Sequence, residues 1–99
     1  MSKQIKVVGM AWYKEEDYGT LRDLFEDGDK LPLTYAQWLQ KAQSGFDELT
    51  ASGHLVVKAY IDPESFGDWC HRAGYGVNAE GRKHFASSFA FDYIKAKQK

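Results

Sequence analysis

The stretch "LVVKAYIDPESFGDW", residues 55–69, decides the expected fold because its pattern changes from strand to helix within a few residues. Residues 54–62 are apolar and rich in β-branched and aromatic side chains, which is typical of a short strand. Asp62, as a cap, and Pro63 then favour the start of a helix, and Gly74 favours its end. The stretch therefore predicts a strand that leads directly into a helix.

A similar pattern occurs earlier in the chain. The segment "VVGMAWYKEEDYGTL", residues 7–21, aligns with residues 55–69 at a shift of 48 positions. A duplicated β-α-α unit would explain this similarity. The other explanation is that any strand-to-helix junction favours a carboxylate near the helix start and apolar residues after it. Both explanations stay open at the level of sequence.

The best-patterned helix is expected at residues 34–50. Its apolar side chains, Trp38 among them, recur at helical spacing and form one face. Thr34 and Gln37 have the spacing of a capping box, and Gly53 follows as a stop signal. This segment therefore predicts an amphipathic helix packed against the sheet.

The remaining elements complete the order β-α-α-β-α-α. A further strand is expected at residues 5–13, and further helices at residues 15–27 and 79–97, the last capped by Asn78. Because two helices connect the strands, the strands are expected to be parallel neighbours. The predicted fold class is α+β, a small two-stranded sheet packed with four helices in a single domain over residues 1–99.

Composition and charge argue against several classes of partner. The chain has 99 residues and a net charge of −1, with a pI near 6.3, which disfavours nucleic acid as a partner because such binding needs a basic face. The first residues contain no sustained apolar run, so neither a signal peptide nor a membrane partner is expected. A single cysteine excludes an internal disulfide and is typical of a reducing compartment. We expect a cytoplasmic protein.

The pair Cys70–His71 raises the question of a reactive thiol. A catalytic cysteine needs solvent access and a nearby positive charge or helix start. Cys70 instead shares its predicted helix face with Phe66 and Trp69. His71 diverges from it by about 100° on a helix, since sequence neighbours do not face one another. The pattern therefore predicts that Cys70 belongs to the core.

No other motif indicates catalysis, a metal or a cofactor. The three histidines lack the spacing of zinc ligands. The glycine-rich segment at residues 74–81 lacks the Lys-Ser/Thr of a phosphate loop and follows a helix rather than a strand. The alternative hypothesis is a small enzyme or ligand-binding protein with a pocket at the loops after the two strands. Its candidate binding residues are His54, Asp62, Tyr75, Asn78 and Arg82.

Charge is spread unevenly along the chain. Residues 15–29 are rich in acids, whereas residues 82–99 are rich in lysine and arginine. Solvated helix faces and a basic tail explain this pattern without a function. The functional interpretation is complementary docking, either between the first and last helices or between two chains.

Two segments carry a resemblance to known proteins. "FEDGDKLPLTYAQWL", residues 25–39, followed by "IDPESFGDWC", residues 61–70, resembles a group of small uncharacterised bacterial proteins of about this length. The resemblance covers most of the chain, and its motifs are aromatic and turn positions. It implies a stand-alone soluble bacterial domain and supplies no activity.

The two faces of the predicted sheet differ in their expected cover. The face that carries Val7, Gly9 and Ala11 is expected under the first two helices. The face that carries Trp12 and Tyr60 is too apolar to be left exposed to water. Either the last two helices cover it within one chain, or a second chain does.

The pattern of the last helix favours a second chain. Apolar side chains occur on more than one of its faces, which is typical of a helix with two neighbours. We therefore expect a homodimer, whose predicted interface residues are Trp12, Tyr60, Phe91 and Ile94. The favoured function is that of a small, soluble, non-catalytic interaction or regulatory protein that associates with itself, and a different protein is the alternative partner.

Overall fold

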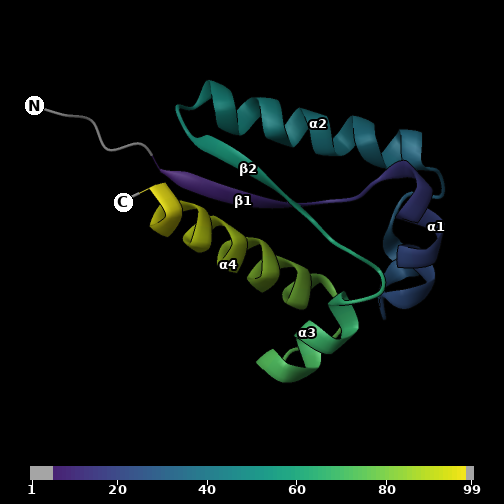
Figure 1. Ribbon diagram of the computed structural model, residues 1–99. Coiled ribbons are helices and arrows are strands. Elements are labelled where there is room, and N and C mark those ends of the chain that lie inside the picture. Colours follow the sequence, from purple (N-terminus) through teal and green to yellow (C-terminus); the bar gives the residue numbers. More distant parts are fainter. Residues whose placement is uncertain (1–5, 98–99) are drawn as a thin grey trace, which may run out of the picture.

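The strand-to-helix pattern occurs twice in the computed structural model, which describes residues 6–97 (Figure 1). The fold is α+β, and the described residues form two strands and four α-helices in the predicted order. The elements are β1 (Val7–Trp12), α1 (Glu15–Leu24), the short 3-10 helix η1 (Gly28–Lys30), α2 (Tyr35–Ala51), β2 (Leu55–Tyr60), α3 (Phe66–Ala73) and α4 (Ala79–Lys97).

The two strands are parallel neighbours, as predicted. Their register runs from Val7 opposite Leu55 to Trp12 opposite Tyr60. Since parallel strands need a long crossover, α1 and α2 fill the connection between them. The sheet formed by the described residues contains these two strands alone. Each strand therefore has one edge that pairs with the other strand and one outer edge.

One helix lies on each face of the sheet, so α2, the sheet and α4 form three layers (Figure 1). On the first face, the Trp12 ring packs edge-on against Trp38 of α2, with ring centroids 5.3 Å apart. On the second face, α4 approaches β1 at Gly9, where an added methyl group would overlap the backbone carbonyl of Ala86. Glycine permits this close approach because it has no side chain.

The assignment of helices to faces corrects the expectation from sequence. The face of Val7, Gly9 and Ala11 lies under α4, and α2 covers the opposite face instead. The physical reason is the size of the side chains: Gly9 leaves room for the α4 backbone, whereas Trp12 needs the aromatic partners that α2 provides. Both faces are therefore covered within one chain.

The core lies mainly beyond the carboxyl ends of the strands. Its buried side chains come from both strand ends and from α1, α2 and α3, and most are aromatic. Trp38 is at its centre, 7 % exposed, and its ring centroid is 4.5 Å from that of Tyr13. The buried cluster consists of Trp12, Tyr13, Tyr18, Leu21, Phe25, Trp38, Ile61, Phe66 and Cys70.

Most predicted helix ends agree with the structure. In α2, the Gln37 N–H donates to Thr34 Oγ1 and the Thr34 N–H donates to Gln37 Oε1 at 3.2 and 3.3 Å, which confirms the capping box. α3 ends at Ala73 and is capped by Gly74, whose φ of 86° is left-handed.

Two predicted helix ends were wrong. α1 ends at Leu24 rather than at residue 27. α3 begins at Phe66 rather than at Pro63. There the Asp62 carboxylate accepts a hydrogen bond from Ser65 Oγ at 3.1 Å, and the Asp62 carbonyl accepts one from the Phe66 N–H at 3.0 Å. The Asp-Pro segment therefore forms a turn before the helix.

The duplication hypothesis stays a prediction. The bounds of β1 and β2 differ by the expected shift, because Val7 and Trp12 correspond to Leu55 and Tyr60. The helices of the two halves differ in length, and α2 and α4 lie on opposite faces of the sheet (Figure 1).

We expect Trp38→Ala to lower the free energy of unfolding by about 3–5 kcal/mol, as for other buried aromatic truncations. Trp38 is buried against four aromatic rings, those of Trp12, Tyr13, Tyr18 and Tyr35. Urea unfolding monitored by circular dichroism measures the change. Leu33→Ala is the control, because Leu33 is 75 % exposed and its truncation should cost less than about 0.5 kcal/mol. Equal losses in the two variants would contradict the central position of Trp38.

Candidate functional site

The five residues predicted to bind a ligand do not form one site. His54 immediately precedes β2, and Asp62 follows its other end. The Nδ1 atom of His54 lies 3.3 Å from the carbonyl oxygen of Leu49 in α2. The Asp62 carboxylate accepts hydrogen bonds from the Glu64 N–H and from Ser65 Oγ, within the turn that leads into α3. These two side chains therefore serve local structure at opposite ends of the strand.

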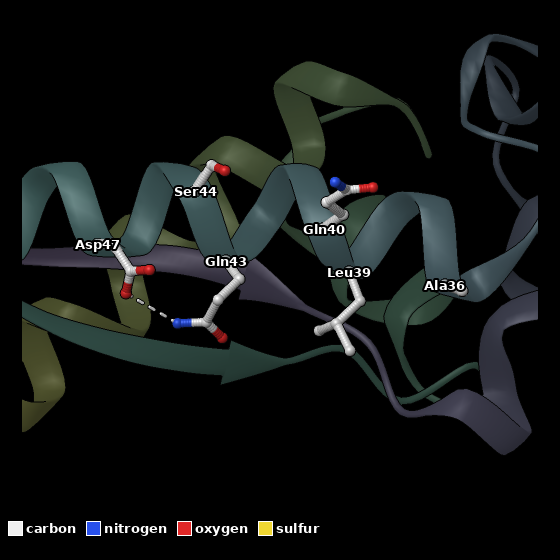
Figure 2. Close-up of a pocket in the computed structure, with 6 residues that line it drawn as sticks. All are labelled: Ala36, Leu39, Gln40, Gln43, Ser44 and Asp47. Carbon is white, nitrogen blue, oxygen red and sulfur yellow. Dashed lines mark hydrogen bonds between the residues drawn. The ribbon is translucent and has the colours of Figure 1, made fainter.

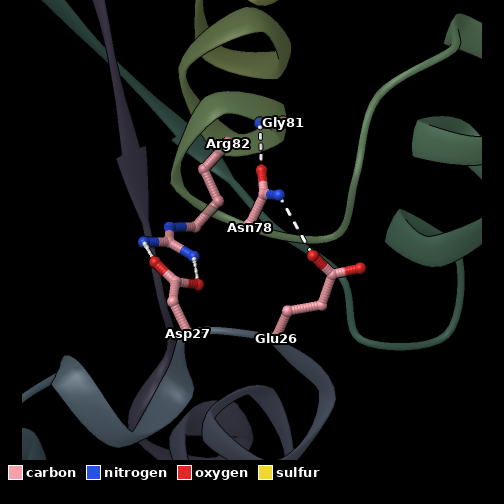
Figure 3. A network of polar contacts seen from close by, with 5 residues as sticks. All are labelled: Glu26, Asp27, Asn78, Gly81 and Arg82. Atoms are coloured by element: carbon pink, nitrogen blue, oxygen red, sulfur yellow. Dashed lines mark hydrogen bonds and ion pairs between the residues drawn. The ribbon is translucent and has the colours of Figure 1, made fainter.

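Asn78 and Arg82 do lie together, at the start of α4 (Figure 3). Asn78 Oδ1 accepts a hydrogen bond from the Gly81 N–H at 3.1 Å, which confirms Asn78 as the cap of α4. Its Nδ2 donates to Glu26 Oε1 at 3.1 Å. The Glu26 N–H in turn donates to the Val77 carbonyl at 2.8 Å. These bonds join the segment after α1 to the first turn of α4.

Arg82 forms a bidentate salt bridge with Asp27 in the same region (Figure 3). The two N–H···O distances are 2.9 and 3.0 Å, and the side chains are 11 % and 21 % exposed. The guanidinium also lies 4.5 Å from the centre of the Phe25 ring. The hydrogen bond from Arg82 is the main reason that the pKa of Asp27 is lowered. Arg82 is thus engaged by Asp27, and the pair pins the acid-rich segment to α4 within the chain.

Tyr75 belongs to an aromatic stack on the flank of α4. Its ring lies parallel to that of His84, with centroids 4.1 Å apart and planes inclined by 7°. The ring of Trp69 stacks on Tyr75 at 6.2 Å. Glu80 Oε2 lies 4.0 Å from His84 Nε2, one helical turn away. Tyr75 therefore has a packing role between α3 and α4.

Buried titratable groups of the core are held in their neutral forms. Cys70 is fully buried, as predicted from its helix face, and burial, together with the nearby Glu26 carboxylate, raises the pKa of its thiol. Burial also raises the pKa of Tyr13 to about 12, against an opposing effect of Arg82. Neither group is therefore ionised at neutral pH, where a nucleophile or base would need to be.

One hollow of about 470 Å³ lies along the flank of α2 (Figure 2). Leu39 and Gln43 extend from the helix toward the strands, and Gln43 Nε2 donates to Asp47 Oδ1 at 3.0 Å. Asp47 is the single titratable side chain of the lining. The hollow is lined by Ala36, Leu39, Gln40, Gln43, Ser44 and Asp47.

That lining offers hydrogen-bonding groups and no pair of acid and base. Across residues 6–97, His, Cys, Asp and Glu side chains do not gather in groups of three that could hold a metal ion. The α2 hollow therefore provides no chemistry that would identify a reaction.

Another hollow, of about 280 Å³, lies between β1 and the carboxyl-terminal half of α4. We call it the β1–α4 groove. Its lining carries no charged side chain, and Phe91, 60 % exposed, stands at its rim. Neither this groove nor the α2 hollow is lined by His54, Asp62 or Tyr75. The groove is formed by Val7, Val8, Gly9, Ser87, Ala90, Phe91 and Ile94.

The predicted interface residues fall into different surroundings. Phe91 and Ile94 both line the β1–α4 groove. Tyr60 is 47 % exposed but belongs to β2, away from this groove. Trp12 is 3 % exposed and lies under the rings of α2, so its assignment to an interface was wrong. A side chain buried within its own chain has no surface to offer a partner.

No sequence pattern predicted that residues of β1 line the groove. Apolar residues on several faces of α4 were a usable signal, because they indicated a second neighbour for Phe91 and Ile94. Val7, Val8 and Gly9 gave no comparable signal. Their role depends on β1 having an outer edge, and a sequence pattern does not reveal which strand edges stay unpaired.

No known family model, curated protein or solved structure matches this chain. Among the described residues, no helix is both long enough and apolar enough to cross a membrane.

The Asp27–Arg82 pair should make stability depend on acid. Because the pKa of Asp27 is lowered in the folded chain, the pair stabilises the fold above the unfolded-state pKa of about 4, and this contribution is lost as the pH falls through the folded value. Asp27→Asn should cost about 1–2 kcal/mol at pH 7 and less in acid. Urea unfolding from about pH 7 down to about pH 2 tests this, with the exposed Asp29→Asn as control. A constant difference between Asp27→Asn and wild type at every pH would refute it.

Cys70 should react slowly with a thiol reagent in the native chain and rapidly in denaturant, because its thiol is buried and protonated. Release of a chromophore from a disulfide reagent measures the rate. A Cys70→Ala, Ser52→Cys chain provides the control, since Ser52 lies exposed after α2 and should react rapidly when folded. If Cys70 in the native chain were labelled as fast as the control cysteine, the result would support a reactive role for the Cys70 thiol.

Proposed function

We propose that this chain is a non-catalytic interaction protein that associates with itself, and that the β1–α4 groove is its contact surface. The observation that carries the proposal is an exposed aromatic side chain, Phe91, at the rim of an uncharged groove. Contiguous apolar surface of this kind is typical of sites where proteins bind one another. A large aromatic residue next to a concave surface is also typical of the anchors of protein interfaces.

The surroundings of the strand ends support a non-catalytic role. In open parallel sheets, ligands bind in the crevice beyond the carboxyl ends of the strands. Here that space is filled, because Tyr13 and Ile61, which directly follow the two strands, are 3 % and 2 % exposed. The rings of Phe25 and Phe66 complete the packing there, with centroids 5.8 Å apart.

The same proposal places the protein in the cytoplasm. Its single cysteine is buried and free, which is compatible with a reducing compartment. The uncharged groove supports an apolar protein surface as partner rather than nucleic acid, which requires cationic side chains at the contact.

Size exclusion coupled to light scattering at micromolar protein tests self-association. We expect wild type to have twice the chain mass of 11.3 kDa. Phe91→Asp should have the single-chain mass, because an unpaired carboxylate in an apolar contact is costly to desolvate. Leu33→Asp, which changes an exposed leucine outside the groove, should stay dimeric. A wild-type mass of one chain at every concentration would exclude the proposal.

A further inference from the structure

The outer edge of β1 has hydrogen-bonding groups that no other described element uses. At the two ends of the strand, the Lys6 and Trp12 carbonyls accept bonds from the Leu55 and Ile61 N–H groups. Groups of alternate residues in a strand point to the same edge, so the even-numbered residues of β1 face β2. The N–H and C=O groups of Val7, Gly9 and Ala11 therefore face outward, beside the β1–α4 groove.

We propose that this edge pairs antiparallel with the same edge of a second copy, which joins two sheets in the strand order β2-β1-β1-β2. The inference rests on the proposed self-association and specifies its geometry. With Gly9 on a two-fold axis, Gly9 meets Gly9 of the second copy, and Val7 meets Ala11. In such a register each of these pairs exchanges both N–H···O bonds. A strand edge that pairs with itself also makes a closed, two-fold interface.

The residues of α4 near the axis leave room for this pairing. Helices on one face of a sheet need about 8–10 Å between their axes, so their facing side chains must be small where they approach most closely. α4 lies over Gly9 at Ala86 and Ala90, and Ser87 lines the groove beside them. Farther along the helix, Phe91 and Ile94 line the same side. In the dimer, Phe91, which follows Ala90, and Ile94, about one turn further along, would lie against the second copy.

The distribution of charge favours a second copy in this antiparallel orientation. β1 leads into the first turn of α1, which carries Glu15, Glu16 and Asp17. The opposite end of β1 lies beside the last turn of α4, which carries Lys95 and Lys97 (Figure 1). Antiparallel pairing brings the acidic end of each chain next to the basic end of the other, whereas parallel pairing would bring like charges together.

Charge reversal tests this orientation directly. One chain carries Glu15→Lys and Glu16→Lys, and a second carries Lys95→Glu and Lys97→Glu. Alone, each variant opposes like charges at both ends of the interface, so its self-association should weaken by about tenfold or more. An equimolar mixture restores opposite charges at both ends and should form a heterodimer with wild-type affinity. A control with Lys41→Glu and Glu48→Lys, exposed in α2, should self-associate like wild type.

Amide hydrogen exchange tests the strand pairing. In the wild-type dimer the N–H groups of Val7, Gly9 and Ala11 should exchange at least about tenfold more slowly than in the monomer obtained by dilution. Val8 and Met10, whose N–H groups face β2, are the internal controls and should be protected in both states.

The measurements distinguish a failure of self-association from a failure of the antiparallel edge pairing. If the wild-type protein is monomeric, both the proposed self-association and the proposed β1 pairing are wrong. A dimer whose Val7, Gly9 and Ala11 amides exchange as fast as in the monomer, or charge variants that associate alone like wild type, leaves self-association in place and overturns the antiparallel edge pairing.

Discussion

The close approach of α4 to β1 at Gly9 is the contact on which the rest of the fold depends. Two strands alone make a marginal sheet, and parallel strands need cover on both faces. α2 can cover one face through Trp38 and Phe46, but the other face has small residues that a helix reaches only by approaching closely. Gly9 permits that approach. The direction of α4 is then fixed at its start by Asn78 and by the Asp27–Arg82 pair.

This arrangement gives the two ends of the sheet different properties. At the carboxyl ends of the strands, aromatic rings from all parts of the chain fill the interior, and the tyrosine hydroxyls find backbone partners: Tyr18 donates to the Pro32 carbonyl at 2.6 Å and Tyr35 to that of Tyr13 at 3.2 Å. At the amino ends the packing is looser: Leu55, the first residue of β2, is 42 % exposed. The buried core therefore lies toward the carboxyl ends of the strands.

The element order, the parallel pairing, the capping box of α2, the Asn78 cap and the burial of Cys70 were all predictable, because each follows from local spacing and chemistry. The start of α3 was not, since the Asp62 side chain can cap a helix or close a turn, and both uses look alike in sequence. The cover of the two sheet faces was also inaccessible, because it depends on how side-chain size at Gly9 and Trp12 selects between two helices. For the same reason Trp12, which is buried, was wrongly assigned to an interface. Phe91 and Ile94 line one groove, and their place in an interface stays a prediction.

The filled carboxyl end and the open β1 edge have a common cause. A chain of this size has enough large side chains for one well-packed region, and here they lie where a parallel sheet would otherwise hold its ligand. The amino-terminal half of β1 is left with Val7, Val8 and Gly9, which line a groove beside α4, and within residues 6–97 no further strand lies beside them. An unpaired edge of this kind either is protected or becomes a contact surface. The side chains that line the groove beside it carry no charge, so the edge lacks the charges by which strands are usually protected, and pairing with a second copy is the outcome that we propose.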